Sequence, residues 1–286
     1  MRSHLALLLS TPLVLGSAIK DRATTPQSFA SSSDGSLKLS AYNAPVKGSG
    51  SSNGASTWSL SIDDTSSGHK QTVEGFGAAV TDSTVTVFNQ LPAAKLTELL
   101  NKLMTSAGAN FAMLRHTIAS SDLSADPSYT YDDAGGNVDT SLSNFNLGDR
   151  GTAMAKLLAR MKGLQPSLTI LGSPWSPPAW MKLNKVLQGN TYQNNLDHTY
   201  VNQFAQYFVK YIQAYKNLGA PIDAITIQNE PLNSNAGFPT MYVYADESGS
   251  LIQNNVGPAL RSAGLSTGVW AYDHNTGKVV YCVANA

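Results

Sequence analysis

Short apolar runs alternate with amphipathic helical patterns from Val73 onward, and this alternation limits the possible fold more than any other feature of the chain. It is typical of a parallel sheet whose successive strands are joined by helices. Five such units can be counted along the sequence. The strands are expected at 73–80, 110–114, 168–171, 222–228 and 268–272. We therefore predict an α/β fold.

The expected strands are followed by unusual polar and proline-rich segments, such as Gly172 to Trp180. Barrel enzymes build their active sites after the carboxyl ends of the strands, so this position favours a (β/α)8 TIM barrel. Each unit takes roughly 40 residues, and a closed barrel would need roughly 120 more than this chain contains. We expect a partial TIM barrel of about five of the eight units. A doubly wound open sheet is the alternative, although no Gly-x-Gly-x-x-Gly follows the first strand.

The first residues have the pattern of a secretory signal. Arg2 is followed by an apolar stretch from Leu5 to Leu15 and by small residues up to Ala18. The stretch is shorter than the roughly 20 residues that a membrane-spanning helix needs. We therefore predict a signal peptide at 1–18 and a secreted, extracellular protein without a transmembrane segment. An uncleaved N-terminal anchor is the alternative.

The rest of the chain is divided into three parts. Residues 19–72 are rich in Ser and Gly, and Trp58, Leu60 and Ile62 alternate with serines as in a half-buried strand. Residues 73–276 are the expected barrel segment. The last part, 277–286, is expected to be a separate tail.

Charge and cysteine content exclude several classes of function. Lys plus Arg equals Asp plus Glu at 19 each, and charged residues make up 13% of the chain. Such a balance gives no strong field for nucleic acid and suits a neutral polymer. The single cysteine, Cys282, cannot form an internal disulfide, so the fold must depend on its apolar core.

Glu230 stands one residue past the strand-like run from Ile225 to Gln228, and Pro231 follows it. Its carboxyl group should therefore project from the end of a strand. A glycosidase needs such a group to protonate the leaving oxygen and then to act as a base towards water. Asn229 could donate a hydrogen bond to a sugar hydroxyl. Taken alone, these residues fit equally well a carboxylate that only caps the following turn.

Several longer segments together resemble glycoside hydrolase family 30, and within it the fungal secreted endo-1,6-β-glucanases. The similarity extends from about Trp58 to Asn275. It is carried by Val-Glu-Gly-Phe-Gly-Ala-Ala-Val-Thr-Asp at 73–82, Leu-Arg-His-Thr-Ile-Ala-Ser-Ser-Asp-Leu-Ser at 114–124, Ser-Pro-Trp-Ser-Pro-Pro-Ala-Trp-Met-Lys at 173–182, Ile-Gln-Asn-Glu-Pro at 227–231 and Trp-Ala-Tyr-Asp-His-Asn-Thr at 270–276.

This resemblance implies roles for five residues. Glu230 would be the acid/base of a retaining hydrolase, and Asn229 would bind the hydroxyl next to the anomeric carbon. Asp82 would hold the non-reducing hydroxyls, Trp175 would stack on a sugar face, and Arg115 would lie beside the nucleophile and keep it ionised. The alternatives are a helix cap for Asp82, a packing aromatic for Trp175 and a structural ion pair for Arg115.

Other features of the family can be only partly transferred. Tyr272, Asp273 and His274 are expected to border the sugar site without an assigned role. A retaining enzyme needs a second carboxylate about 5 Å from the first. The family takes it from the seventh barrel strand, so no residue of this chain is assigned as nucleophile. By the same resemblance, the N-terminal strands belong to a β-sandwich side domain.

The expected substrate is a β-glucan polysaccharide, cleaved at internal β-1,6 linkages, or another β-glucoside. A glucosylceramidase-type or other β-glycosidase activity is the first alternative, and a non-catalytic product without a nucleophile is the second. No cofactor, metal or nucleic acid is expected, and the protein is expected to be a monomer. Calcium binding by Asp132, Asp133 and Asp139 is a weaker alternative, because these residues lack a regular ligand spacing.

Overall fold

The computed structural model describes residues 28–42, 63, 65–189, 193–233, 237–275 and 277. The expected signal peptide, the expected strand at Trp58 and nearly all of the expected tail lie outside these residues. The chain divides into two compact units, Met1–Gln71 and Thr72–Ala286. In the described part of the first unit, strands β1 (Ser28–Ala30) and β2 (Ser40–Tyr42) form an antiparallel pair.

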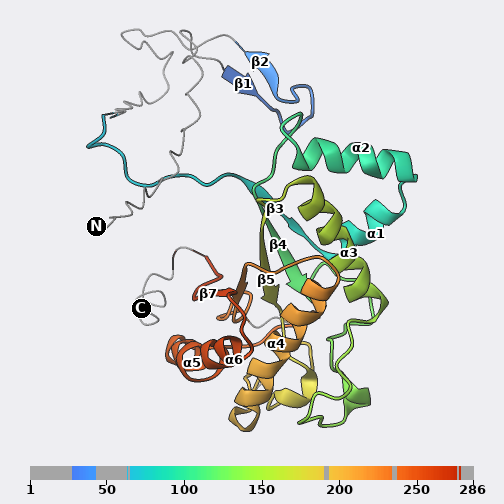
Figure 1. Cartoon of the computed structure of the whole chain (residues 1–286), viewed down its shortest axis with the longest axis vertical. Helices are drawn as coiled ribbons and strands as arrows, with labels where there is room; N and C mark the ends of the chain where they lie inside the picture. The colour runs from blue at the N-terminus through green and yellow to red at the C-terminus, as the bar shows by residue number, and fades with distance from the viewer. Residues whose placement is uncertain are drawn as a thin grey trace, which may run out of the picture. The chain divides into compact units, whose positions relative to one another are not determined.

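The second unit is built on a parallel sheet of five strands (Figure 1). Their order in the sheet is their order in the sequence, which is the order of a barrel wall. A doubly wound sheet would reverse direction at a switch point. The sheet therefore confirms the expected partial TIM barrel with five strands. They are β3 (Gly77–Val80), β4 (Met113–Ile118), β5 (Thr169–Pro174), β6 (Ala224–Thr226) and β7 (Gly268–Trp270).

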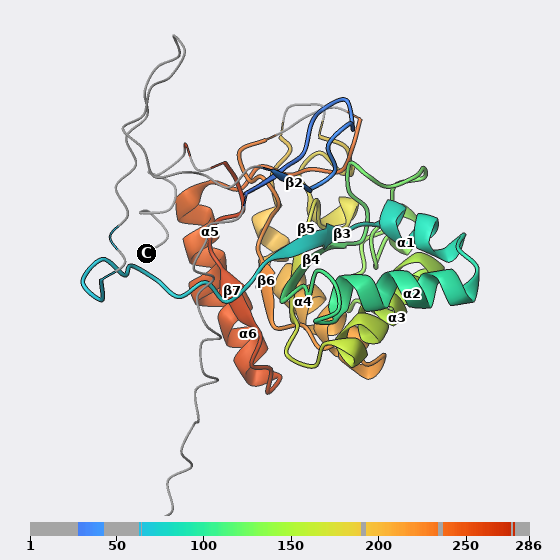
Figure 2. The ribbon, with the colours of Figure 1, turned by 90° about the horizontal axis from the view of Figure 1, so that it is seen from above.

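The helices of the described residues are α1 (Asp82–Asn89), α2 (Ala93–Met104), α3 (Gly148–Leu164), α4 (Val201–Asn217), α5 (Ala245–Leu251) and α6 (Gly257–Ser262), with a π-helical segment at Ile252–Val256 between the last two. Helices α2, α3, α4 and α6 follow one another in that order around one side of the sheet (Figure 2). Helix α3 packs against α1 and α2, and α4 packs against α6. The 3-10 turns η1 (Ala134–Gly136), η2 (Ala179–Met181) and η3 (His198–Tyr200) lie in the loops.

Helix α4 shows how the core is formed. Its buried side chains recur at helical spacing and include several aromatic rings, which cover the sheet with large apolar surfaces. His116 of β4 is fully buried beside them, with its ring 5.0 Å from that of Tyr215. Its Nδ1 contacts the Thr117 carbonyl oxygen, which can only accept, so Nε2 accepts from the Tyr211 hydroxyl. Burial lowers the pKa of His116 to about 3.

Two strands extend further than the apolar pattern predicts. We expected β4 to end at Leu114, but it continues to Ile118, because Arg115 still pairs with Ala79 on one side and Leu171 on the other. Strand β5 was expected to end at Leu171 and instead includes Gly172 and Pro174. Pro174 has no N–H to donate, and it is tolerated because β6 pairs with β5 only at Leu171 and Gly172 and not at Pro174.

Helix α1 was not among the elements expected from the sequence. It is short, and it begins directly after β3, where the side chain of Thr81 caps it. Pro92 lies just before the second helix, α2.

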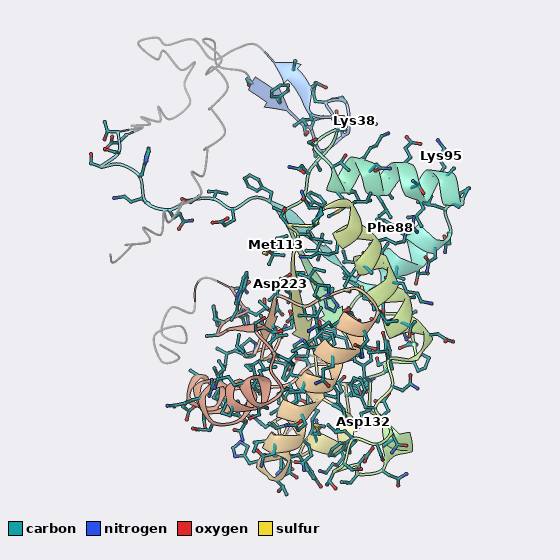
Figure 3. All side chains as sticks on the ribbon, in the orientation of Figure 1. Lys38, Phe88, Lys95, Met113, Asp132 and Asp223 are labelled. Atoms are coloured by element: carbon teal, nitrogen blue, oxygen red, sulfur yellow. The ribbon has the colours of Figure 1, made fainter. Side chains whose placement is uncertain are left out.

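The two edges of the sheet differ. Figure 3 shows Met113 and Asp223 at the edge where the strands begin and Asp132 beyond the opposite edge, where they end. The candidate site residues lie at this second edge. Among the described residues, no helix combines the length and apolarity needed to cross a bilayer.

Candidate active site

Glu230 lies just beyond β6, half-buried, on an uncommon backbone. Its φ of +42° is in the left-handed region, which costs a residue other than glycine about 1–3 kcal/mol. Pro231 also disfavours the right-handed helical conformation at the preceding residue. The conformation is fixed by two backbone hydrogen bonds: the Glu230 N–H donates to the Asp273 carbonyl, and the Glu230 carbonyl accepts from the Asn233 N–H, both at 2.8 Å. Strain maintained in this way is typical of functional sites.

The carboxylate of Glu230 is also held in place. Asn233 donates from Nδ2 to Glu230 Oε2 at 2.6 Å, and the Asn233 carbonyl oxygen accepts from Thr240 Oγ1 at 2.7 Å. The Thr240 carbonyl oxygen in turn accepts from Nζ of the fully buried Lys182 at 2.8 Å. Burial lowers the pKa of Lys182 to about 7. A continuous set of hydrogen bonds thus joins the loops after β5 and β6 behind Glu230.

A second network connects side chains of three strands with the segment after β7 through Arg115 and Asp273. Arg115 Nη2 donates to Asp273 Oδ2 at 2.8 Å and to Asn229 Oδ1 at 2.7 Å. Asp273 Oδ2 also accepts from Ser173 Oγ at 2.6 Å and from Thr226 Oγ1 at 3.0 Å. The side chains of β4, β5 and β6 therefore converge on one carboxylate that follows β7.

Trp175 and Asn229 are both buried next to this network. The guanidinium carbon of Arg115 lies 4.9 Å from the centroid of a Trp175 ring, a cation–π distance, and Trp175 is 7% exposed. Asn229 donates its backbone N–H to the Pro174 carbonyl at 2.8 Å. Since Arg115 uses the amide oxygen of Asn229, the NH2 group is the part of this side chain that can donate to a sugar hydroxyl.

Asp82 belongs to a different network. It is the first residue of α1, whose cap is Thr81, and its carboxylate is buried. That carboxylate accepts from Ser124 Oγ at 2.8 Å, from the Tyr129 hydroxyl at 3.2 Å and from Arg150 Nη2 at 2.7 Å. A sugar hydroxyl would therefore have to share carboxylate oxygens that already accept three protein donors.

The structure thus brings Glu230, Asn229, Arg115 and Trp175 to one part of the sheet edge. Asn233 and Ser173 were not predicted as site residues from the sequence, and Asp273 was given no role. The signal for Asp273 was its place directly after a strand, since parallel strands end at a common edge. Asn233 had only a weak signal, namely an amide three residues after the candidate acid.

The acidic loop after β4 has its own electrostatic pattern. Asp132 is 1% exposed, and neither of its carboxylate oxygens has a hydrogen-bond partner among the described residues. Burial, together with the charge of Asp139, raises the pKa of Asp132 to about 6. Asp139 accepts from Asn144 and nearby serines, and these hydrogen bonds hold its pKa well below the usual range. Across the described ranges, no three His, Cys, Asp or Glu side chains gather as a metal site would require.

The chain is similar to known proteins over most of its length. Residues 73–279 match the family described as the glycosyl hydrolase family 30 TIM-barrel domain. The chain is 69% identical over 274 residues to the endo-1,6-beta-D-glucanase of Neurospora crassa, covering 96% of this chain and 56% of that protein. It is 31% identical over 204 residues to the lysosomal acid glucosylceramidase of Mus musculus, covering 68% of this chain and 38% of that protein.

A solved endo-beta1,6-glucanase structure superposes with a TM-score of 0.65 at 32% identity. The match covers 72% of this chain and 45% of the solved one. The chain thus spans about half the length of these relatives.

Proposed function

We propose that this chain, which belongs to glycosyl hydrolase family 30, supplies the acid/base part of an active site that cleaves internal β-1,6 linkages of glucan with retention. The observation that carries the proposal is the position of Glu230. Its carboxylate projects from a strained backbone at the carboxyl edge of a barrel sheet, and Asn233 holds one of its oxygens. The names of the similar fungal proteins and of the solved glucanase support the choice of substrate.

In the proposed first step, a carboxylate nucleophile attacks the anomeric carbon while the carboxyl group of Glu230 gives its proton to the glycosidic oxygen. The bond between the anomeric carbon and that oxygen breaks, and the leaving glucan departs as an alcohol. In the second step Glu230, now ionised, takes a proton from water, and the oxygen of that water displaces the nucleophile. The resemblance to the family places the nucleophile on the seventh barrel strand, outside the five strands of this chain.

The neighbouring residues would bind the sugar and organise the charges. The NH2 group of Asn229 is suited to the hydroxyl next to the anomeric carbon. Arg115, held by Asp273, would place a positive charge beside the nucleophile and favour its ionised form. Trp175 would stack on a sugar face with the part of its ring that Arg115 does not cover. Asp82 would hold the non-reducing hydroxyls of the sugar with carboxylate oxygens that also accept hydrogen bonds from three protein donors.

A glucosylceramidase-type activity is the second candidate, favoured by the similarity to the Mus musculus enzyme. The much higher identity to the fungal glucanase favours the polysaccharide.

We also propose that the parent protein is secreted. The signal-like pattern up to Ala18 supports this, and secretion suits a polymer too large to enter a cell.

The proposal can be tested with a hybrid protein in which residues 19–275 of this chain are joined to the C-terminal part of the Neurospora crassa relative. The hybrid should release reducing sugar from pustulan, a β-1,6-glucan, and should act poorly on glucosylceramide. Glu230→Gln should lower the rate by about 10²–10⁴-fold. Glu98→Gln, a change at an exposed helix residue, is the matched control and should leave the rate unchanged. Equal rates for the two variants would exclude Glu230 as the acid/base.

A further inference from the structure

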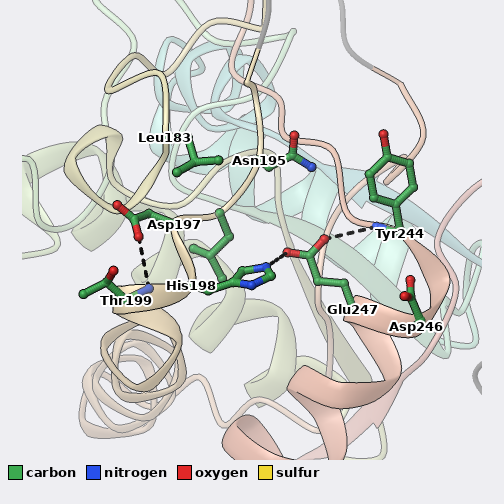
Figure 4. A pocket seen from close by; sticks show the side chains of 9 residues that line it. Leu183, Asn195, Asp197, His198, Thr199, Tyr244, Asp246 and Glu247 are labelled. Carbon is green, nitrogen blue, oxygen red and sulfur yellow. Dashed lines mark hydrogen bonds and ion pairs between the residues drawn. The ribbon is translucent and has the colours of Figure 1, made fainter.

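A pocket of about 570 Å³ lies beside the carboxyl edge of the sheet, between the starts of two helices. On one side is the turn η3 that leads into α4, and on the other is the first turn of α5. Figure 4 shows the side chains around it. Those used below are Leu183, Asp197, His198, Tyr244, Asp246 and Glu247.

One wall of the pocket is built by the same loop that carries Glu230. Val243 is fully buried and donates its N–H to the carbonyl oxygen of Pro231, the residue after Glu230, at 2.9 Å. Its neighbours Tyr242 and Tyr244 lie two positions apart, so in an extended segment both point to the side opposite Val243. Their rings are parallel, with an interplanar angle of 2° and centroids 6.3 Å apart. The pocket is therefore close in the fold to the candidate acid, but it presents its own residues.

The charges around the pocket select against anions. Three carboxylates, from Asp197, Asp246 and Glu247, line the pocket, and they outnumber their two basic partners: Lys185 Nζ lies 3.4 Å from Asp197 Oδ2, and the imidazole of His198 faces Glu247. Glu247 Oε1 lies 3.0 Å from His198 Nε2, and the Glu247 side chain is only 12% exposed, so its orientation is fixed by its neighbours. This excess of carboxylates would repel phosphate, sulfate or uronate groups, whereas the hydroxyl groups of a neutral ligand can donate to it.

The apolar surface of the pocket has the form that a sugar requires. Tyr244 is 54% exposed and stands at the rim, where Figure 4 shows its ring free of the polar contacts below. Leu183, 44% exposed, lies across from it. A pyranose ring has an apolar C–H face and a perimeter of hydroxyls. An exposed aromatic ring beside carboxylates matches both parts of such a ligand.

We propose that this pocket binds neutral glucan at glucosyl units away from the linkage that Glu230 cleaves. The inference rests on the proposed function, because it takes the polymer as the ligand. A long chain bound near Glu230 would pass over the same loop, and a second contact on that loop raises the effective concentration of the polymer at the site. No charge on the ligand is needed, in agreement with the negative character of the pocket.

The test is affinity electrophoresis of the full chain in native gels that contain pustulan. The chain should migrate more slowly with pustulan than without it, and a gel with anionic polygalacturonate should cause no such delay. Tyr244→Ala should weaken the apparent binding by about tenfold or more, while Tyr244→Phe, which keeps the ring, should bind as the unchanged protein does. Asp246→Asn, a change of one exposed group, should weaken binding to a smaller extent.

Three results would overturn the inference: no delay of the unchanged chain, an equal delay for Tyr244→Ala, or an equal delay in polygalacturonate. Melting curves of each variant identify any that do not fold. If Tyr244→Ala does not fold, the delay of Asp246→Asn relative to the unchanged chain decides the outcome. Glu98→Gln, at an exposed position of α2, should be delayed like the unchanged chain. This readout does not depend on hydrolysis, so failure of the pocket and failure of the proposed catalytic role are distinguishable.

Discussion

The backbone N–H of Glu230 donates a hydrogen bond of 2.8 Å to the carbonyl oxygen of Asp273. This bond joins the segment after β6 to the segment after β7 and helps to fix the left-handed backbone of the candidate acid. The side chain of the same Asp273 pairs with Arg115. A single residue therefore positions both the candidate acid and the cation expected beside the nucleophile.

Asp273→Asn should destabilise the protein, because Arg115 would lose its charged partner while keeping the shape of its surroundings. With both side chains about one-fifth to one-quarter exposed, we expect a loss of about 1–3 kcal/mol in the free energy of unfolding. Urea unfolding measures it. Asp122→Asn, at an exposed loop position, should change the free energy by less than about 0.5 kcal/mol. Similar losses for the two variants would show that the Arg115 pair contributes nothing.

Asn233→Ala should lower the turnover of the hybrid about 10–100-fold with little change in KM. The hydrogen bond at 2.6 Å to Glu230 Oε2 orients the carboxylate, and a small misplacement of a catalytic group is costly. Initial rates on pustulan over a range of concentrations separate the two constants. Asn254→Ala, at an exposed position on the π-helical segment, is the control. A rise in KM alone would mean that Asn233 binds substrate rather than positions Glu230.

His116 should make the protein less stable towards acid. Its pKa is about 3 in the folded chain and about 6.5 when unfolded, so between these values only the unfolded state binds the proton. The free energy of unfolding should therefore fall, through this group, by about 1.4 kcal/mol per pH unit as the pH decreases from about 6.5 towards about 3. His116→Gln, which can still accept from Tyr211, should reduce this slope between about pH 6 and pH 4. The exposed His69→Gln should not. Identical slopes would contradict the buried neutral state.

Asp132 should change the pH dependence of the free energy of unfolding in the direction opposite to that of His116. Its folded pKa of about 6 exceeds the unfolded value near 3.9, so in this interval the folded state keeps a proton that the unfolded state has lost. Its contribution to stability therefore declines as the pH rises from about 4 to 6. Asp132→Asn, which carries no charge, should be more stable than the unchanged protein by on the order of 1–3 kcal/mol near pH 7 and about equal to it near pH 4. Thermal melts at the two pH values test this, and a gain that is the same at both would argue against ionisation as the cause.

The sequence predicted the order of the strands well because each buried strand is a short apolar run and each helix has one apolar face. The position of Glu230 followed from the same rule, since it comes directly after such a run. The prediction was wrong where polar residues continue a strand. Arg115 lies inside β4, and Ser173 lies inside β5, because their side chains meet partners from other strands rather than an apolar core.

The interactions that fix the candidate site could not be predicted in the same way. The pair of Arg115 and Asp273 depends on the closeness of β4 and β7 segments that are far apart in the chain, and no local pattern encodes that distance. The left-handed backbone of Glu230 depends on Asp273 and Asn233 as much as on Pro231. Helix α1 was missed because it consists of Asp, Ser, Thr, Val, Phe and Asn residues, all of which have low intrinsic helix propensity.

The central claim, that Glu230 is the acid/base, is tested most directly by chemical rescue of Glu230→Ala in the hybrid. The substrate is 2,4-dinitrophenyl β-gentiobioside, whose leaving group needs no acid. The variant should form the glycosyl-enzyme but release it slowly, and added azide should restore turnover and yield a β-configured glycosyl azide, while pustulan hydrolysis stays lost. Unchanged pustulan hydrolysis in Glu230→Ala, or the absence of any β-azide product, would contradict the account.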